Sequence, residues 1–433
     1  MLRLIYNLLF PLGLLVFLPG YLLKMRRRGN YRRNFGQRFG FYSEAVRARL
    51  VGHEMTWIHA VSVGEVAIAL KLAAKLRELE PTLRCVLTTT TTTGFAFAEK
   101  EAPDWMEVMY NPLDFWPIVQ RAFATIHPKR ILLVEAEIWP NLAAEARSRG
   151  VPLALVNARL SPRSERRFLK LRRFITPTFR CLDLVCVQEQ QDLERWAALG
   201  IPQDAIKVVG SIKYDPTEDA PDSTLPFRIL GSFCIDQTRS ILFGGSTHPG
   251  EEEILGQAFL RLRVEFPSLI LIIAPRHVER TPAIVTRLEQ LGLRVALRSA
   301  AETAAAVEPD CLLLDSTGEL RTWYAVAAVV FVGKSLTVHG GQNPAEPILA
   351  GKPVIFGPHM ENFAALAHTL LAQDAAIQVQ GGADLVERCA ELLRDPARRT
   401  QLVKNAERVL VAHRGATQRT AELVISLRSR SRG

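Results

Sequence analysis

Beyond residue 50, short apolar runs alternate with helix-like stretches over the whole length of the chain. This alternation is typical of a parallel sheet that is covered by helices on both faces. The stretch 65–79, for example, places Val66, Leu70 and Ala73 on one helical face. The predicted strands are 56–61, 85–89, 130–135, 153–157, 184–188 and 207–209, then 240–243, 269–274, 294–296, 311–314, 329–332 and 354–356.

A proline-rich, acidic segment at 214–237 interrupts this alternation, which then restarts. It contains Pro216, Pro221 and Pro226 together with five acidic residues, a composition typical of an interdomain linker. The sequence therefore predicts an α/β protein with two Rossmann-like, doubly wound parallel-sheet domains that face a cleft. We place the two domains at 51–213 and 238–412, and a C-terminal helix with a basic tail at 413–433.

The formal net charge of +10 is concentrated at the two ends of the chain. Three arginines lie between residues 426 and 433, and seven cations without any anion lie between residues 24 and 38. The seven cations are Lys24, Arg26, Arg27, Arg28, Arg32, Arg33 and Arg38. Because these ten residues account for the whole excess, the rest of the chain is electrically balanced and lacks a broad basic face. We predict no nucleic-acid partner.

An apolar stretch without any charge, 4–23, precedes the basic cluster. As a helix it would be about 30 Å long, the thickness of a hydrocarbon core. Pro11 and Pro19 leave open whether it spans a membrane or lies in the interface. Because no small-residue cleavage site precedes the cations, we predict an uncleaved membrane anchor at 1–24 and a basic juxtamembrane segment at 25–50. Such cations favour the cytoplasmic side and an anionic membrane surface as partner.

The six cysteines are scattered along the chain, without a CxxC pair, and several lie in apolar runs. This pattern favours free, mostly buried thiols over disulfides or a metal site.

Glu65 follows the first predicted strand, where ligands bind in open parallel sheets. Ser62 can cap the next helix and Gly64 permits a tight turn between strand and helix. Two interpretations stay open for Glu65 at this point. It is either a capping-box carboxylate at the helix N-terminus or a general base that takes a proton from an acceptor hydroxyl.

Two further groups of polar residues follow later strands of the first domain. Glu135 and Glu137 share a face if the chain is extended, but the turn into a helix beginning at Pro140 should separate them. Lys213 follows the last strand of the domain. Both groups also fit solvated surface charges.

The second domain carries residues suited to a nucleotide. The segment 244–251 follows a strand and opens a helix, so its backbone N–H groups could receive phosphate. Arg276 and His277 follow the next strand. The segments 315–319 and 340–346 are glycine-permitted turns, and Glu346 could accept ribose hydroxyls.

This layout is that of a two-domain glycosyltransferase, with the acceptor in the membrane-linked half and a nucleotide sugar in the other half. Inverting transfer needs a base on the acceptor hydroxyl and stabilisation of the leaving phosphate. No DxD-type acidic pair occurs in a nucleotide context, so we predict no metal and no cofactor besides the donor substrate.

Several strings resemble the 3-deoxy-D-manno-oct-2-ulosonic acid (Kdo) transferases of lipopolysaccharide synthesis, in order and spacing, over nearly the whole chain. They are His59-Ala-Val-Ser-Val-Gly-Glu65, Glu135-Ala-Glu-Ile-Trp-Pro-Asn141, Asn157-Ala-Arg-Leu-Ser161, Gly210-Ser-Ile-Lys-Tyr-Asp215, Ala274-Pro-Arg-His277 and Gly340-Gly-Gln-Asn-Pro-Ala-Glu346.

The resemblance implies a GT-B fold and inverting transfer of Kdo from CMP-Kdo to the 6′-hydroxyl of a lipid A precursor at the bacterial inner membrane. It implies that Glu65 is the proton acceptor and that Glu135 and Lys213 stabilise the transition state. The implied CMP contacts are Pro275, Arg276, Thr317, Gly318, Glu319, Asn343, Pro344, Ala345 and Glu346. The family commonly has Gly where this chain has Lys334 and His where it has Gln342, two departures near the implied donor site.

Three alternatives share parts of this pattern. A membrane-bound GT-B transferase that uses a UDP-sugar would have the same architecture. A sugar-nucleotide epimerase would not need the apolar stretch 4–23. A catalytically inactive, membrane-tethered binding module would not need the full set of polar residues after the strands.

Overall fold

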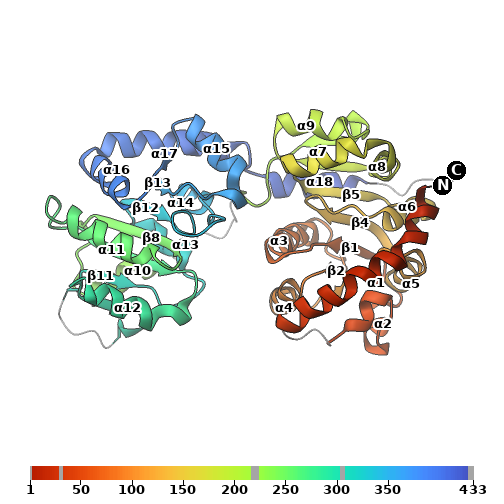
Figure 1. Ribbon diagram of the computed structural model, residues 1–433, viewed down its shortest axis with the longest axis horizontal. Helices are drawn as coiled ribbons and strands as arrows, with labels where there is room; N and C mark the ends of the chain where they lie inside the picture. Colours follow the sequence, from red (N-terminus) through yellow and green to blue (C-terminus); the bar gives the residue numbers. More distant parts are fainter. Residues whose placement is uncertain (1, 29–32, 216–223, 303–307, 428–433) are drawn as a thin grey trace. The chain divides into compact units, whose positions relative to one another are not determined.

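The computed structural model of the protein describes residues 2–28, 33–215, 224–302 and 308–427. The chain forms two compact units: unit 1 is Met1–Asp215 with His413–Gly433, and unit 2 is Pro216–Ala412 (Figure 1). Each unit contains one sheet of seven strands. The prediction of two doubly wound, parallel α/β units is therefore confirmed.

All neighbouring strands of the unit 1 sheet are parallel, in the order β3-β2-β1-β4-β5-β6-β7. The strands are β1 (Met55–His59), β2 (Cys85–Thr89), β3 (Met106–Tyr110), β4 (Pro128–Val134), β5 (Leu153–Ala158), β6 (Leu184–Val187) and β7 (Ile206–Val208). The central strand β1 is buried at every position, because helices cover both faces of the sheet.

Two separate apolar cores lie on the two faces of this sheet. Trp57 and its face pack with α2, α5, α6 and α9, whereas Ile58 and the opposite face pack with α3, α4 and α18. The helices of unit 1 are α1 (Leu2–Arg28), α2 (Glu44–Leu50), α3 (Val63–Leu79), α4 (Thr92–Glu101), α5 (Trp116–Ile126), α6 (Pro140–Arg149), α7 (Pro162–Lys170), α8 (Arg172–Phe179), α9 (Gln190–Ala197) and α18 (Ala416–Ser426).

The unit 2 sheet is also parallel, in the order β10-β11-β9-β8-β12-β13-β14. Its strands are β8 (Ile241–Thr247), β9 (Ile270–Pro275), β10 (Val295–Leu297), β11 (Cys311–Leu313), β12 (Val329–Val332), β13 (Val354–Phe356) and β14 (Ile377–Gln378). The helices are α10 (Thr224–Ser232), α11 (Glu251–Leu262), α12 (Thr281–Gln290), α13 (Leu320–Trp323), α14 (Ala345–Leu349), α15 (Ala364–Ala372), α16 (Gly382–Arg394) and α17 (Pro396–Val411).

Both sheets reverse their strand order beside their first strand. In unit 1 the chain runs outward from β1 to β3 and then returns to place β4 on the other side of β1. In unit 2 the same reversal lies between β8 and β12. The loops on the two sides of such a reversal diverge, and they leave a crevice at the carboxyl ends of the strands.

Two strands, β3 and β14, are absent from the sequence-based prediction. Both are edge strands: β14 has only two residues, and β3 interrupts its apolar residues with Glu107. An edge strand is buried less completely, so its hydrophobic signal is weak. The predicted linker 214–237 contains α10, and its residues 216–223 lie outside the described part of the chain.

Helix α1 includes the predicted anchor and continues through both of its prolines. It packs on unit 1 by its polar residues, since Arg3 Nε and Asn7 Nδ2 each donate to Asn141 Oδ1 at 2.9 Å. Phe10 stacks on Phe115 with ring centroids 5.5 Å apart. Among the described residues, no helix combines the length and apolar character that crossing a bilayer requires.

One of the seven cations does not face solvent. Arg38 is 3% exposed, donates to the carbonyl of Thr90 and lies over the ring of Tyr110. Its role is structural, so it does not belong with the cations expected to meet lipid head groups. The six cysteines are free thiols, and four of them are buried, as predicted.

Candidate active site

Glu65 lies in the first turn of α3, directly after the carboxyl end of β1. Ser62 caps this helix: its Oγ accepts from the backbone N–H of Glu65 and donates to Glu65 Oε1 at 2.9 Å. The second carboxylate oxygen, Oε2, accepts from the backbone N–H of Val61 at 2.8 Å. Glu65 therefore lies in a variant of the capping box that one interpretation predicts, because its carboxylate accepts from the N–H of the residue before the N-cap. Gly64 is not the turn residue we expected, because it lies within α3 without a positive φ.

The surroundings of Glu65 set it apart from an ordinary capping carboxylate. Burial, opposed by the hydrogen bond from Val61 and reinforced by the charges of Glu135 and Glu137, raises the pKa of Glu65 to about 7. A surface capping carboxylate stays ionised at far lower pH. A carboxylate that titrates near neutral pH is suited to exchange a proton with a substrate, so the capping position of Glu65 is compatible with the general-base interpretation.

Glu135 follows β4, the strand beside β1 at which the order of the sheet reverses. Its φ of 64° is in the left-handed region, and its backbone N–H donates to the carbonyl of Val156 at 3.0 Å. A non-glycine residue adopts this conformation at a cost of about 1–3 kcal/mol, which the surrounding structure must offset. Such strained residues cluster at functional sites.

Glu137 also lies close to this group, contrary to our expectation for the pair. Its charge adds to the effect of burial on the pKa of Glu65, and its own pKa is raised by burial and by Glu135. The turn after β4 therefore does not separate the two carboxylates. Sequence reasoning did not select Glu137 as a site residue, although the Glu-x-Glu spacing was the signal for it.

Lys213 lies in a tight turn, 211–215, that two buried side chains hold. Asn157 Oδ1 accepts from the backbone N–H of Ile212 at 2.9 Å and from Ser211 Oγ at 3.2 Å. His413 Nδ1 accepts from the backbone N–H of Ser211 at 3.1 Å. Because burial lowers the pKa of His413 to about 4, its ring stays neutral and can accept this bond at physiological pH.

Asp215 ties the same turn to the C-terminal helix. Its carboxylate accepts from the backbone N–H groups of Gly415 at 2.7 Å and Thr417 at 2.8 Å, at the start of α18. Lys71 of α3 donates to the carbonyls of Ile212 and Asp215.

Tyr214 connects the Lys213 turn with the carboxylate group. Burial raises the pKa of Tyr214 to about 12, and the charge of Glu135 adds to this rise. The Lys213 turn therefore lies near Glu135. The structure thus brings all three predicted catalytic residues to one edge of the unit 1 sheet.

The predicted nucleotide contacts lie after β9, β11 and β12, at one edge of the unit 2 sheet. Pro275 ends β9 and is buried, whereas the side chain of Arg276 is exposed. Thr317 and Gly318 are exposed. Asn343 Oδ1 accepts from the backbone N–H of Ala345, after Pro344, and its Nδ2 donates to Glu346 Oε1 at 3.0 Å.

Glu319 is engaged within the protein. It forms a two-point ion pair with Arg298 at 2.8 and 2.9 Å and accepts from Ser316 at 3.0 Å. Burial raises its pKa, but these partners outweigh burial and lower the pKa overall. Its carboxylate therefore shapes the loop after β11.

In the segment 244–251, the backbone N–H of His248 is engaged by a side chain of the protein itself, the carboxylate of Glu251. Glu251 is fully buried, and its carboxylate accepts from the backbone N–H groups of His248, Lys334, Ser335 and Leu336 at 2.7–3.0 Å. Glu251 thus takes one N–H group of the segment at which we expected a phosphate, and joins this segment to the loop after β12. Sequence reasoning gave Glu251 no role, because its partners are distant in sequence.

Lys334 has a φ of 58°, a left-handed conformation that favours glycine. This conformation explains why the Kdo transferases that the sequence resembles commonly have glycine at this position. The following loop reaches Gly340 and Gly341, which also have positive φ, before Gln342 and Asn343.

Solved structures identify the fold. The chain is similar to UDP-GlcNAc 2-epimerase from Neisseria meningitidis, with a TM-score of 0.56, 12% identity, and coverage of 87% of this chain and 100% of that chain. The two units therefore form the GT-B fold of glycosyltransferases and related sugar-nucleotide enzymes.

The amino-acid sequence narrows this class. A family model described as 3-deoxy-D-manno-octulosonic-acid transferase (kdotransferase) matches residues 33–216. The chain is 34% identical to the 3-deoxy-D-manno-octulosonic acid transferase of Haemophilus influenzae, over 91% of each chain. It is 35% identical to the enzyme of that name from Bordetella pertussis, over 84% of this chain and 86% of the relative. The chain belongs to the Kdo transferase family, as the sequence motifs predict.

Asp215→Ala tests how the Lys213 turn is held. The variant loses the acceptor of two N–H groups at the start of α18, so we expect unit 1 to lose about 1–3 kcal/mol of stability. Thermal unfolding measures this loss, with the exposed Asp204→Ala as control. Equal melting temperatures for Asp215→Ala and Asp204→Ala would contradict the assigned role of Asp215.

Proposed function

We propose that the protein transfers Kdo from CMP-Kdo to the 6′-hydroxyl of a lipid A precursor, with inversion, at the cytoplasmic face of a bacterial inner membrane. The observation that carries the proposal is Glu65, a carboxylate whose pKa is raised to about 7 at the point where the strand order of unit 1 reverses. Membership in the Kdo transferase family supports the identity of the transferred sugar.

In the proposed step, ionised Glu65 takes the proton of the acceptor hydroxyl as that oxygen forms a bond to C2 of Kdo. The bond between C2 and the phosphate oxygen breaks, and CMP leaves with its electron pair. Glu65 ends the step protonated and returns its proton to water. The hydrogen bonds from Val61 and Ser62 fix the carboxylate before the substrate arrives, so no reorganisation is needed during transfer.

The charges that develop in this step need partners of opposite sign. Positive charge grows at C2 of Kdo, and Glu135 is the carboxylate that we assign to it. Negative charge grows on the departing phosphate, and we assign the cation Lys213 to that group. This cation supplies charge stabilisation, so the proposed reaction uses no metal and no cofactor besides the donor.

We assign the CMP part of the donor to the loops of unit 2. The exposed positions of Arg276, Thr317 and Gly318 support this assignment, because they leave side chain and backbone available to a ligand. Asn343 and Glu346 hold each other at the start of α14, directly after a glycine-containing loop.

We propose that α1 lies along an anionic membrane surface. Arg3 and Asn7 bind Asn141 of unit 1 and Phe10 stacks on Phe115, whereas seven other large apolar residues of the helix are exposed. The exposed residues are Leu4, Ile5, Leu8, Leu9, Leu12, Leu15 and Val16. A helix with one docked polar side and one exposed apolar side is suited to insertion into the interface.

Product analysis with the purified full-length protein tests the reaction. With CMP-Kdo and a tetraacylated lipid A precursor, we expect a product heavier by Kdo, and no product with UDP-sugars. Glu65→Gln should lower turnover at least about 100-fold, because the amide cannot accept the proton. Glu54→Gln, an exposed glutamate before β1, should leave turnover unchanged.

Glutamine also suits a capping box, so Glu65→Gln should remain folded. The raised pKa means that ionised Glu65 costs stability above about pH 7, and this cost vanishes below the unfolded value near 4.5. The variant should therefore melt no lower than the native protein at pH 8. Near-normal turnover by this folded variant would contradict the assignment of the base.

The pH dependence of transfer is a separate prediction. Protonated Glu65 cannot act as a base, so kcat/KM should fall below about pH 7 and level off above it. Glu137→Gln removes a neighbouring negative charge and should move the midpoint to lower pH. A midpoint that stays in place in Glu137→Gln would show that another group controls the profile.

Vesicle binding tests the placement of α1. Leu8→Gln combined with Leu12→Gln removes two exposed side chains, each worth about 1.5–3 kcal/mol when buried. We expect binding to vesicles that contain anionic lipid to weaken at least about tenfold. Val264→Gln, which changes an exposed apolar residue of unit 2, is the control. Equal binding by the double variant and by Val264→Gln would contradict the proposal that this apolar face of α1 binds the membrane.

A further inference from the structure

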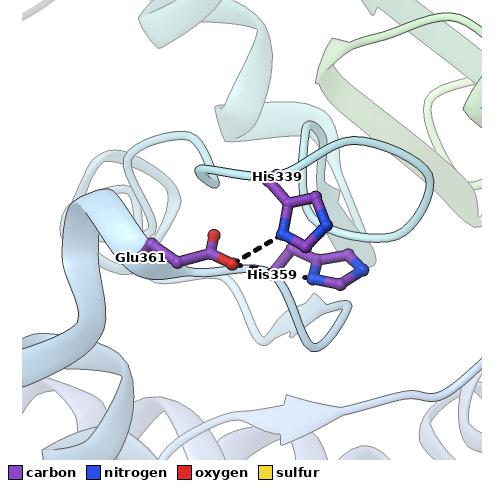
Figure 2. A group of neighbouring side chains, drawn as sticks. All are labelled: His339, His359 and Glu361. Carbon is purple, nitrogen blue, oxygen red and sulfur yellow. Dashed lines mark hydrogen bonds and ion pairs between the residues drawn. The ribbon is translucent and has the colours of Figure 1, made fainter.

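Two histidines and a glutamate converge at the carboxyl edge of the unit 2 sheet (Figure 2). His339 lies in the loop after β12, and His359 and Glu361 lie in the segment after β13. Glu361 Oε1 is 2.9 Å from His339 Nδ1 and 3.7 Å from His359 Nδ1. Each of the three side chains offers one ligand atom, and these three atoms all lie within 4.8 Å of one another.

This set of atoms matches the ligands that Zn²⁺ prefers. Two imidazole nitrogens and one carboxylate oxygen, with a fourth position left to water, form a common zinc set. With bonds of roughly 2.0–2.1 Å in tetrahedral geometry, neighbouring ligand atoms lie about 3.3 Å apart. The separations of 2.9 and 3.7 Å lie on either side of this value and the third lies within 4.8 Å, so rotation of the side chains would bring the three atoms around one ion.

The carboxylate is already oriented for this role. Its other oxygen, Oε2, accepts from the backbone N–H of Gly340 at 2.7 Å, which leaves Oε1 to face the imidazoles. Outer hydrogen bonds of this kind fix ligands and strengthen metal binding.

The two segments that carry the ligands are joined before any ion binds. The backbone N–H of His359 donates to the carbonyl of Ser335 at 2.9 Å, and that of Asn362 donates to the carbonyl of Gly340 at 2.8 Å. Gly341 approaches Met360 so closely that a Cβ atom there would lie 2.6 Å from Sδ. The ligands therefore stand on a fixed backbone, which lowers the entropy lost on binding.

We infer that His339, His359 and Glu361 bind one divalent transition-metal ion, with Zn²⁺ the best match to the ligand set. The ion takes no part in the transfer step. It would hold the loop 333–343, which ends at Asn343, against the segment 357–363. Binding of the ion does not depend on the proposed function, so the two can fail separately.

Calorimetric titration of the full-length protein with Zn²⁺ after chelation and dialysis tests the site. We expect one ion per chain, and binding at least about tenfold weaker in His339→Ala and in His359→Ala. His368→Ala, an exposed histidine of α15, is the matched control and should bind as the native protein does. All three variants alter side chains on the surface or near it, and thermal unfolding checks that each is folded.

The exposed thiol of Cys234 is the main competing ligand, so the titration is repeated in Cys234→Ser. Binding that persists in Cys234→Ser and is lost in His339→Ala supports the inference. Loss of binding in Cys234→Ser overturns the inference. So does binding that is unchanged in both His339→Ala and His359→Ala, or the absence of binding by the native protein.

Discussion

The reversal of strand order beside the first strand of each sheet determines where this protein can place its chemistry. In unit 1 the reversal lies between β1 and β4; Glu135 directly follows β4, and Glu65 lies in the first turn of α3, the helix that follows β1. In unit 2 the reversal lies between β8 and β12. The carboxylate of Glu251 connects the loop after β8 with the loop after β12 by hydrogen bonds. The loops on the two sides of such a reversal diverge and leave space for a ligand. Polar residues from distant parts of the sequence line this space, because the strands that carry them end at the same edge of the sheet.

Two carboxylates at these positions show how hydrogen bonding decides between a structural and a chemical role. Glu251 is fully buried but accepts from four backbone N–H groups, which hold its carboxylate in place. Glu65 accepts from one backbone N–H and one hydroxyl and has two negative neighbours, so burial raises its pKa to about 7. The first carboxylate stabilises a loop, and we propose that the second exchanges a proton near neutral pH.

The sequence is sufficient to predict the two parallel sheets and the positions of Glu65, Glu135 and Lys213, since apolar runs mark strands and ligands follow strand ends. It does not reveal the role of Glu251, three of whose four partners lie 83–85 residues away, or the burial of Arg38. The short edge strands β3 and β14 escape detection because little of their surface is buried. Long-range hydrogen bonds and burial depend on tertiary packing, which local patterns do not encode.

The central claim is that Glu65 carries a proton that it exchanges near neutral pH. The direct measurement is a titration of ¹³C-labelled glutamate carboxyl groups in the full-length protein by nuclear magnetic resonance, with the Glu65 signal assigned by its loss in Glu65→Gln. We expect a midpoint near pH 7 for this signal. A midpoint near 4.5, the value of an unperturbed glutamate, would contradict the claim.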